Sequence, residues 1–93
     1  MSIKSFRCSD TKAIYGGQHP RRFEQIDTVA QRKLQMLDSA EQLQDLRSPP
    51  GNRLESLKGD RRGQYSIRFN DQWRICFVWT DAGAQEVEIV DYH

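Results

Sequence analysis

Apolar residues recur at helical spacing in the first half of the chain. They lie three or four residues apart, at Phe23, Ile26, Ala30, Leu34, Leu37 and Ala40. This spacing gives a helix one apolar face, so we expect a helix over residues 23–40. Leu43 and Leu46 continue the pattern as a short second helix, which Pro49 and Pro50 end because proline cannot extend a helix.

In the second half the pattern changes to strict alternation. Within QYSIRFNDQWRICFVW, apolar residues take every second position on both sides of NDQ, which is the period of strands with one buried face. Both strands bury the same face only if the loop has three residues, 70–72, which pairs Ile67 with Ile75. The same register places Arg68 opposite Arg74 on the other face. Two such charges repel each other, and a bound polyanion would reverse that effect.

The two ends of the chain also alternate. SIKSF at the start predicts a short first strand, and QEVEIVDYH at the end predicts a last strand. Helices followed by strands with short turns indicate an α+β fold. We expect an N-terminal strand and two helices packed on one face of an antiparallel-rich β-sheet, with the arginines on the other face. A chain this short has room for one core, so residues 1–93 are expected to form a single domain.

Composition and cysteine content indicate a reduced, cytoplasmic protein. The chain is 37% hydrophobic and 29% charged, as is usual for a folded domain. It has neither a secretory signal nor the roughly 18 consecutive apolar residues of a membrane span. Cys8 and Cys76 are far apart in the sequence, so a disulfide framework is not expected.

Charge is unevenly distributed, although the formal net charge is only +1. Residues 1–46 carry a net charge of +1, residues 47–74 carry +4 and residues 75–93 carry −4. Most charge blocks are simply solvated faces. The middle block is nevertheless rich in arginine, whose planar guanidinium suits bidentate contacts with phosphate, so it predicts binding of a polyanion.

The candidate chemistry is proton transfer without a metal or other cofactor. His19 and His93 are the only histidines, and no Cys/His cluster has metal-ligand spacing. RNA cleavage by a ribose 2′-OH needs only an acid, a base and cations that stabilise the phosphate. The terminal residues Asp91, Tyr92 and His93 could supply the first two. Strict alternation, however, places Asp91 and His93 on the apolar face, away from the arginines, unless the strand ends, twists or bulges.

The segment PPGNRLESLKGDRRGQYSIRFNDQWRICFVW and the terminal VEIVDYH resemble the HigB-type (plasmid maintenance killer) toxins of the RelE/ParE superfamily. The resemblance implies a RelE-like fold and a toxin of a type II toxin–antitoxin system. It further implies a metal-free endoribonuclease that cuts mRNA in the ribosomal A site. The implied partners are the ribosome, mRNA and a HigA-type helix-turn-helix antitoxin, which binds operator DNA as part of the complex.

The resemblance also implies roles for individual residues. The catalytic candidates are Asp91, Tyr92 and His93 of the terminal triplet, Lys58 of LKGD and Arg74 after the tryptophan. Arg68 is a further candidate for binding RNA, and the basic middle block adds Arg53, Arg61 and Arg62. Family members often have a histidine three residues before the lysine, where this chain has Glu55. We include Glu55 in the RNA-binding set, and its identity leaves the acid and base assignments open.

Two other functions fit the same sequence. A ParE-like inhibitor of DNA gyrase would block a protein target, but an inhibitor has no need of the terminal acid–base residues. A non-catalytic RNA- or protein-binding module would use the arginine face alone. Such a module predicts that His93→Gln leaves activity intact while Arg74→Ala removes it.

Overall fold

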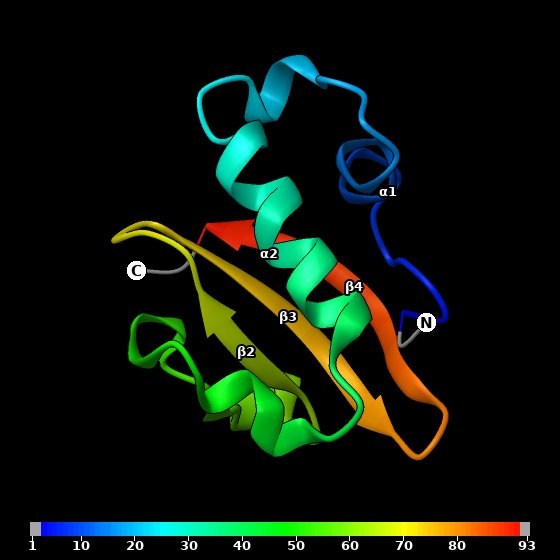
Figure 1. The fold of residues 1–93 in the computed structure, drawn as a ribbon, viewed down its shortest axis with the longest axis vertical. Coiled ribbons are helices and arrows are strands. Elements are labelled where there is room, and N and C mark those ends of the chain that lie inside the picture. Colours follow the sequence, from blue (N-terminus) through cyan, green and yellow to red (C-terminus); the bar gives the residue numbers. More distant parts are fainter. Residues whose placement is uncertain (1–2, 92–93) are drawn as a thin grey trace.

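The computed structural model describes residues 3–91 (Figure 1). Its helices are α1 (Ser9–Tyr15) and α2 (Asp27–Ser39), with 3₁₀ turns at Arg21–Phe23, Leu43–Arg47, Pro50–Asn52 and Gly59–Arg61. Its strands are β1 (Glu55–Ser56), β2 (Tyr65–Arg68), β3 (Trp73–Thr80) and β4 (Gly83–Asp91). The strands form one antiparallel sheet in the order β1-β2-β3-β4, and α2 crosses one of its faces. The predicted α+β class is confirmed.

Helix α2 provides the apolar face that the sequence pattern predicts. Ala30, Leu34 and Leu37 are fully buried against the sheet, and burying a leucine side chain stabilises the fold by about 2 kcal/mol. The helix begins at Asp27 rather than at residue 23, because Phe23 lies in a separate 3₁₀ turn. An acidic residue in the first turn is favourable beside the unpaired N–H groups of a helix start.

The other helical elements differ from expectation. The second helix is a 3₁₀ turn at Leu43–Arg47, with only Leu46 buried. The structure adds α1, which the apolar spacing does not reveal because only Thr11 and Ile14 of its seven residues are buried. The sequence marks only where α1 ends, because a glycine pair follows it. Gly17 has a φ of 92°, a conformation that favours glycine.

The N-terminal segment does not form the predicted strand. Ile3 and Phe6 make isolated parallel bridges to β4. The ladder is interrupted where β4 contains a bulge, next to Glu86, whose φ is 54°. There the hydroxyl of Ser5, rather than a backbone carbonyl, accepts the hydrogen bond from the Glu86 N–H at 2.9 Å. The bulge therefore ties the start of the chain to β4 without a continuous strand.

The β2–β3 hairpin has the predicted register. Ile67 pairs with Ile75, and Arg68 pairs with Arg74. The side chain of Asn70 stabilises the turn by accepting hydrogen bonds from the backbone N–H groups two and three residues later, both at 2.8 Å. The buried isoleucines face α2, so the paired arginines belong to the opposite face.

Candidate functional site

Arg74 is a buried arginine on the sheet face opposite α2. It is 7% exposed. Its Nε donates a hydrogen bond to Ser66 Oγ at 2.7 Å, and its Nη2 donates one to the carbonyl oxygen of Arg53 at 2.8 Å. The same Nη2 lies 3.6 Å from Oε2 of Glu55. A buried cation requires such partners, and together they fix the plane of the guanidinium.

Arg53 has an unusual backbone conformation that serves this contact. It follows the 3₁₀ turn Pro50–Asn52 and has φ 44° and ψ 58°, in the left-handed region. For a residue with a side chain this conformation costs about 1 kcal/mol and is often found at functional sites. Here it accompanies the contact in which the Arg53 carbonyl accepts from Arg74.

Arg68 is compensated separately from the arginine that it faces. Its Nε donates to the carbonyl oxygen of Asn70 at 2.9 Å, and its Nη2 pairs with the carboxylate of Asp71. Glu55 plays the corresponding role for Arg74. The repulsion expected across the hairpin is therefore offset by two carboxylates, and the arginine pair is stable without a bound anion.

These side chains surround a shallow pocket of about 210 Å³. We call it the arginine pocket; it is lined by Arg53, Glu55, Arg68, Asn70, Asp71 and Arg74. Three guanidinium groups face two carboxylates, so the pocket carries a net positive charge. Arginine binds phosphate oxygens in a bidentate manner, and the buried contacts of Arg74 hold one guanidinium in place for this purpose.

A second charged cluster lies on the same sheet face. Arg61 Nη1 donates to Glu88 Oε1 at 2.8 Å, and Arg7 Nη1 lies 4.0 Å from the same oxygen. The contact holds the 3₁₀ turn Gly59–Arg61 against β4. Cys76 is fully buried on this face, and burial raises the pKa of its thiol. The thiol therefore stays protonated near neutral pH. The hydrogen bond from Arg61 to Glu88 gives Arg61 a structural role.

Lys58 and Arg62 flank that turn and are exposed. Lys58 precedes the turn as its N-cap residue, and Arg62 follows it. Within residues 3–91, neither side chain forms a hydrogen bond or a salt bridge. Both cations are therefore available to a ligand, unlike Arg74 and Arg68, which already have protein partners.

Asp91 ends the described part of β4 close to the β2–β3 turn. It pairs with Trp73 across the sheet, and its Oδ2 accepts a hydrogen bond from Gln72 Nε2 at 3.0 Å. Arg74 of the arginine pocket pairs with Val90, so the described part of β4 ends beside this pocket. Trp73 packs against the hydrophobic core, and its cross-strand partner Asp91 lies on the same apolar face of the sheet, as the alternation predicts. The predictions for Tyr92 and His93 lie outside the described residues.

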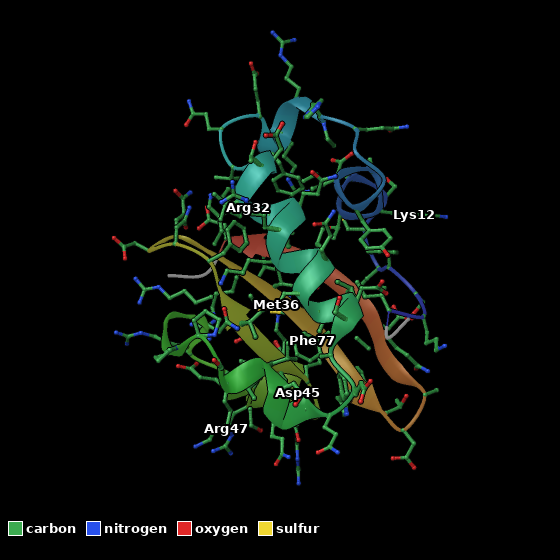
Figure 2. The ribbon with its side chains drawn as sticks, viewed as in Figure 1. Lys12, Arg32, Met36, Asp45, Arg47 and Phe77 are labelled. Carbon is green, nitrogen blue, oxygen red and sulfur yellow. The ribbon has the colours of Figure 1, made fainter. Side chains whose placement is uncertain are left out.

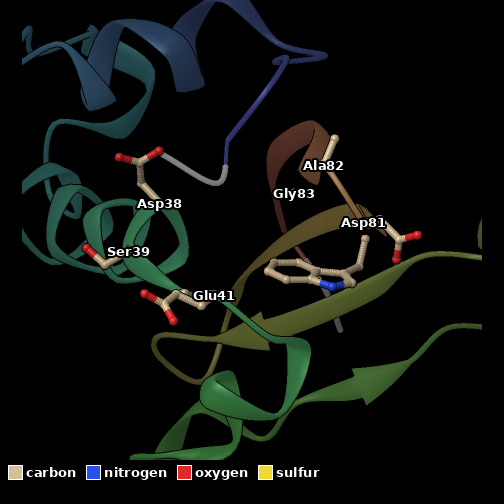
Figure 3. Close-up of a pocket in the computed structure, with 8 residues that line it drawn as sticks. Asp38, Ser39, Glu41, Asp81, Ala82 and Gly83 are labelled. Carbon is tan, nitrogen blue, oxygen red and sulfur yellow. The ribbon is translucent and has the colours of Figure 1, made fainter.

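A pocket at the other end of β3 has the opposite charge (Figure 3). Its volume is about 440 Å³, and its charged lining residues are Asp38, Glu41 and Asp81. Arg74 lies near the start of β3, whereas Trp79 of this acidic pocket lies near its end. Three carboxylates without a basic side chain repel a polyanion, so this acidic pocket is not a candidate site for binding one.

The part of the chain that the structure describes contains neither a metal-ligand group nor a membrane-spanning helix. Among residues 3–91, no three histidine, cysteine or acidic side chains are grouped as metal ligands would be. No helix in this part of the chain has the length and apolar character needed to cross a membrane.

The sequence pattern missed the two groups that hold Arg74 in place most directly. One is the Ser66 hydroxyl, and the other is the backbone carbonyl of Arg53. Ser66 offered a signal, since the predicted register puts it on the arginine face, two residues before Arg68. The carbonyl offered none, because a left-handed arginine is not recognisable from residue type.

Solved structures first define the class of fold. The chain aligns over its full length with YoeB–YefM complexes from Staphylococcus aureus, one of them described as a heterotetrameric toxin–antitoxin complex. The TM-score is 0.62 in both cases, each alignment covers 99% of the matched chain, and the identities are 18% and 20%. This likeness establishes a shared α+β fold with the YoeB-containing structures.

The family model described as RelE-like toxin of type II toxin–antitoxin system HigB matches residues 5–93. The chain therefore belongs to the HigB-like toxin family. It is 32% identical over 93 residues to Endoribonuclease HigB of Proteus vulgaris, covering 98% of this chain and 99% of that one. It is 49% identical over 59 residues to Toxin HigB-1 of Vibrio cholerae, covering 63% of this chain.

The alignments with two of these relatives are partial. The match covers 62% of the Vibrio cholerae toxin and 64% of an uncharacterized protein from Haemophilus influenzae that is 41% identical over 65 residues. The Proteus vulgaris alignment, in contrast, spans both proteins almost completely, and with the family model it covers the arginine pocket and the C-terminal strand.

Proposed function

We propose that this chain is the toxin of a type II toxin–antitoxin system and cuts mRNA in the A site of the ribosome. One observation carries the proposal: Arg74 is buried, pairs with Val90 near the described end of β4, and lines an open, positively charged pocket. Family membership and the name of the Proteus vulgaris relative support an endoribonuclease.

In the proposed reaction the RNA supplies its own nucleophile, the ribose 2′-OH. A phosphate oxygen binds Arg74, which stabilises the negative charge that builds up on phosphorus. Lys58, which has no protein partner in the described structure, contributes a second cation. As the 2′ oxygen bonds to phosphorus, its proton passes to a base of the terminal group, for which Asp91 and Tyr92 are the candidates, and His93 protonates the leaving 5′ oxygen. The P–O5′ bond breaks and leaves a cyclic 2′,3′-phosphate, with one proton accepted and one delivered by side chains.

The proposed partners follow from the same assignment. A HigA-type helix-turn-helix antitoxin neutralises the toxin, and the complex binds operator DNA through the antitoxin. The solved structures of similar fold are toxin–antitoxin complexes, which supports an antitoxin partner. Ribosomes and mRNA place the activity in the cytoplasm.

The direct test is cleavage of mRNA on programmed 70S ribosomes, with ribosome-free RNA alongside. We expect cuts in the A-site codon only when ribosomes are present, and new 3′ ends that carry a cyclic or linear phosphate. New 3′-hydroxyl ends would contradict the 2′-OH mechanism. Growth arrest by a toxin that cuts no mRNA would instead favour the gyrase-inhibitor alternative.

Arg74→Lys tests the fixed guanidinium. Lysine keeps the charge, but one amine cannot contact Ser66, Glu55 and the Arg53 carbonyl in the geometry of the planar fork. We expect the single-turnover rate of ribosomal cleavage to fall about 30-fold. This loss is smaller than that for removing a hydrogen-bond donor to the oxyanion altogether, because lysine keeps the positive charge. Arg47→Lys, at an exposed position outside the arginine pocket, is the control (Figure 2). Equal rates for both variants would show that the buried contacts of Arg74 have no role in cleavage.

A further inference from the structure

A second basic pocket lies where the 3₁₀ turn between α1 and α2 meets the β2–β3 hairpin. Its volume is about 300 Å³. It is lined by Arg21, Arg22, Phe23, Glu24, Gln25, Ile26, Gln72 and Trp73. These residues come from two parts of the chain about 50 positions apart, and the sequence gives no sign that they meet.

The two arginines of this pocket are held on an anchored turn. Phe23 is 1% exposed and packs edge-on against Trp73, with ring centroids 5.4 Å apart. The guanidinium carbon of Arg22 lies 4.8 Å from the centroid of the Phe23 ring, a cation–π contact that restrains the side chain without neutralising it. Neither Arg21 nor Arg22 forms a salt bridge within residues 3–91.

The second basic pocket adjoins the arginine pocket. Asn70 and Asp71 of the hairpin turn line the arginine pocket, and Gln72 and Trp73 line the second one. The amide of Gln72 also donates to Asp91 at the end of β4. The hairpin turn therefore separates two basic pockets, and Asp91, the last described residue of β4, lies beside it.

The charge of the second basic pocket suits a phosphate ligand. Two arginines face one carboxylate, Glu24, in the lining, and the nearby carboxylate of Asp91 is hydrogen-bonded to Gln72. Among residues 3–91 no carboxylate pairs with these exposed guanidinium groups, so phosphate binding there breaks no ion pair of the described structure. A linear polyanion that enters the arginine pocket would place neighbouring phosphates around the hairpin turn.

We propose that Arg21 and Arg22 form a second binding site for the RNA phosphodiester backbone, next to the cleavage site. This inference rests on the proposed function, since it extends the path of the same RNA. The site carries no catalytic group. It holds the strand on the far side of the hairpin turn from Arg68 and Arg74.

The test is equilibrium binding of RNA by the double variant Arg21→Gln/Arg22→Gln, in a His93→Gln background that prevents cleavage. A control double variant, Arg32→Gln/Arg47→Gln, removes the same charge from exposed positions outside both basic pockets (Figure 2). We expect affinity for a single-stranded RNA at about 0.1 M salt to fall about tenfold, and the log–log salt slope to decrease by about 1.4. The control should bind nearly as the parent does.

Binding to empty 70S ribosomes distinguishes the source of the phosphates. Weaker binding to free RNA with unchanged binding to empty ribosomes supports contact with mRNA, and weaker binding to both supports a phosphodiester site that also contacts ribosomal RNA. Weaker binding to ribosomes alone would overturn contact along the mRNA path and assign the two arginines to ribosomal RNA. Affinity and salt slope equal to those of the control on both ligands would overturn the second site. The readout is binding, so a wild-type protein that fails to cleave mRNA would defeat the proposed function separately. Circular dichroism checks that each variant is folded.

Discussion

Replacing His93 with glutamine is expected to lower the rate of mRNA cleavage on ribosomes about 1000-fold, within the range for loss of a general acid. Glutamine can still donate a hydrogen bond, but it cannot deliver a proton near neutral pH. The chain has only one other histidine, His19, whose Nδ1 lies 2.7 Å from Oδ2 of Asp27. Glu55 occupies the position at which the family resemblance implies a second histidine. Loss of His93 therefore removes the only imidazole proposed for the site.

The measurement is single-turnover cleavage of an A-site codon, with His19→Gln as the matched control. The control should cleave at the wild-type rate, because the assigned partner of His19 is a structural carboxylate at the start of α2. If His93→Gln cleaves as fast as the control, the acid must be another residue, such as Tyr92 or Lys58. If it no longer cleaves but still binds programmed ribosomes, the loss is in proton transfer.

Replacing Asn52 with alanine is expected to lower the free energy of unfolding by about 3 kcal/mol. Asn52 is fully buried. Its Nδ2 donates to the carbonyl oxygens of Leu46 and Ser48 at 3.1 and 3.3 Å, and its Oδ1 accepts from Lys33 Nζ at 2.6 Å. Alanine would leave the Leu46 carbonyl buried without this partner. It would also deprive Lys33, whose pKa burial already lowers, of its hydrogen-bond acceptor.

Urea unfolding of Asn52→Ala and of Gln35→Ala, an exposed amide on α2, measures this effect. We expect Gln35→Ala to stay within about 0.5 kcal/mol of wild type. Asn52 directly precedes Arg53, whose carbonyl holds Arg74. The alanine variant should therefore also cleave mRNA more slowly under conditions in which it is fully folded. A stability change below about 1 kcal/mol would mean that solvent replaces the lost contacts.

Long periodic segments made much of the fold predictable. The alternation on both sides of NDQ is long enough to specify the hairpin register, including the pairing of Arg68 with Arg74. The spacing of Ala30, Leu34 and Leu37 likewise predicts α2. Helix α1 has too few buried residues for its period to appear. The interrupted N-terminal strand depends on a bulge about 80 positions away in sequence, which local pattern cannot reveal.

For the candidate site, residue types were predictable but their partners were not. The charge block and the family resemblance single out Arg68, Arg74 and Lys58. The structure shows that Arg74 is buried and anchored, whereas Lys58 has no partner in the described part of the chain. It also shows that Arg61 is bound to Glu88. These differences depend on contacts between segments that are distant in sequence.

The opposite charges at the two ends of β3 also have a kinetic consequence. With the arginine pocket at one end and the acidic pocket of Asp38, Glu41 and Asp81 at the other, the molecule has an electric dipole along the strand. In the field of a large polyanion such a dipole turns the molecule during approach, so that the basic end leads. Productive encounters with a ribosome would then be faster than the small net charge implies. The association rate should fall as added salt screens the field.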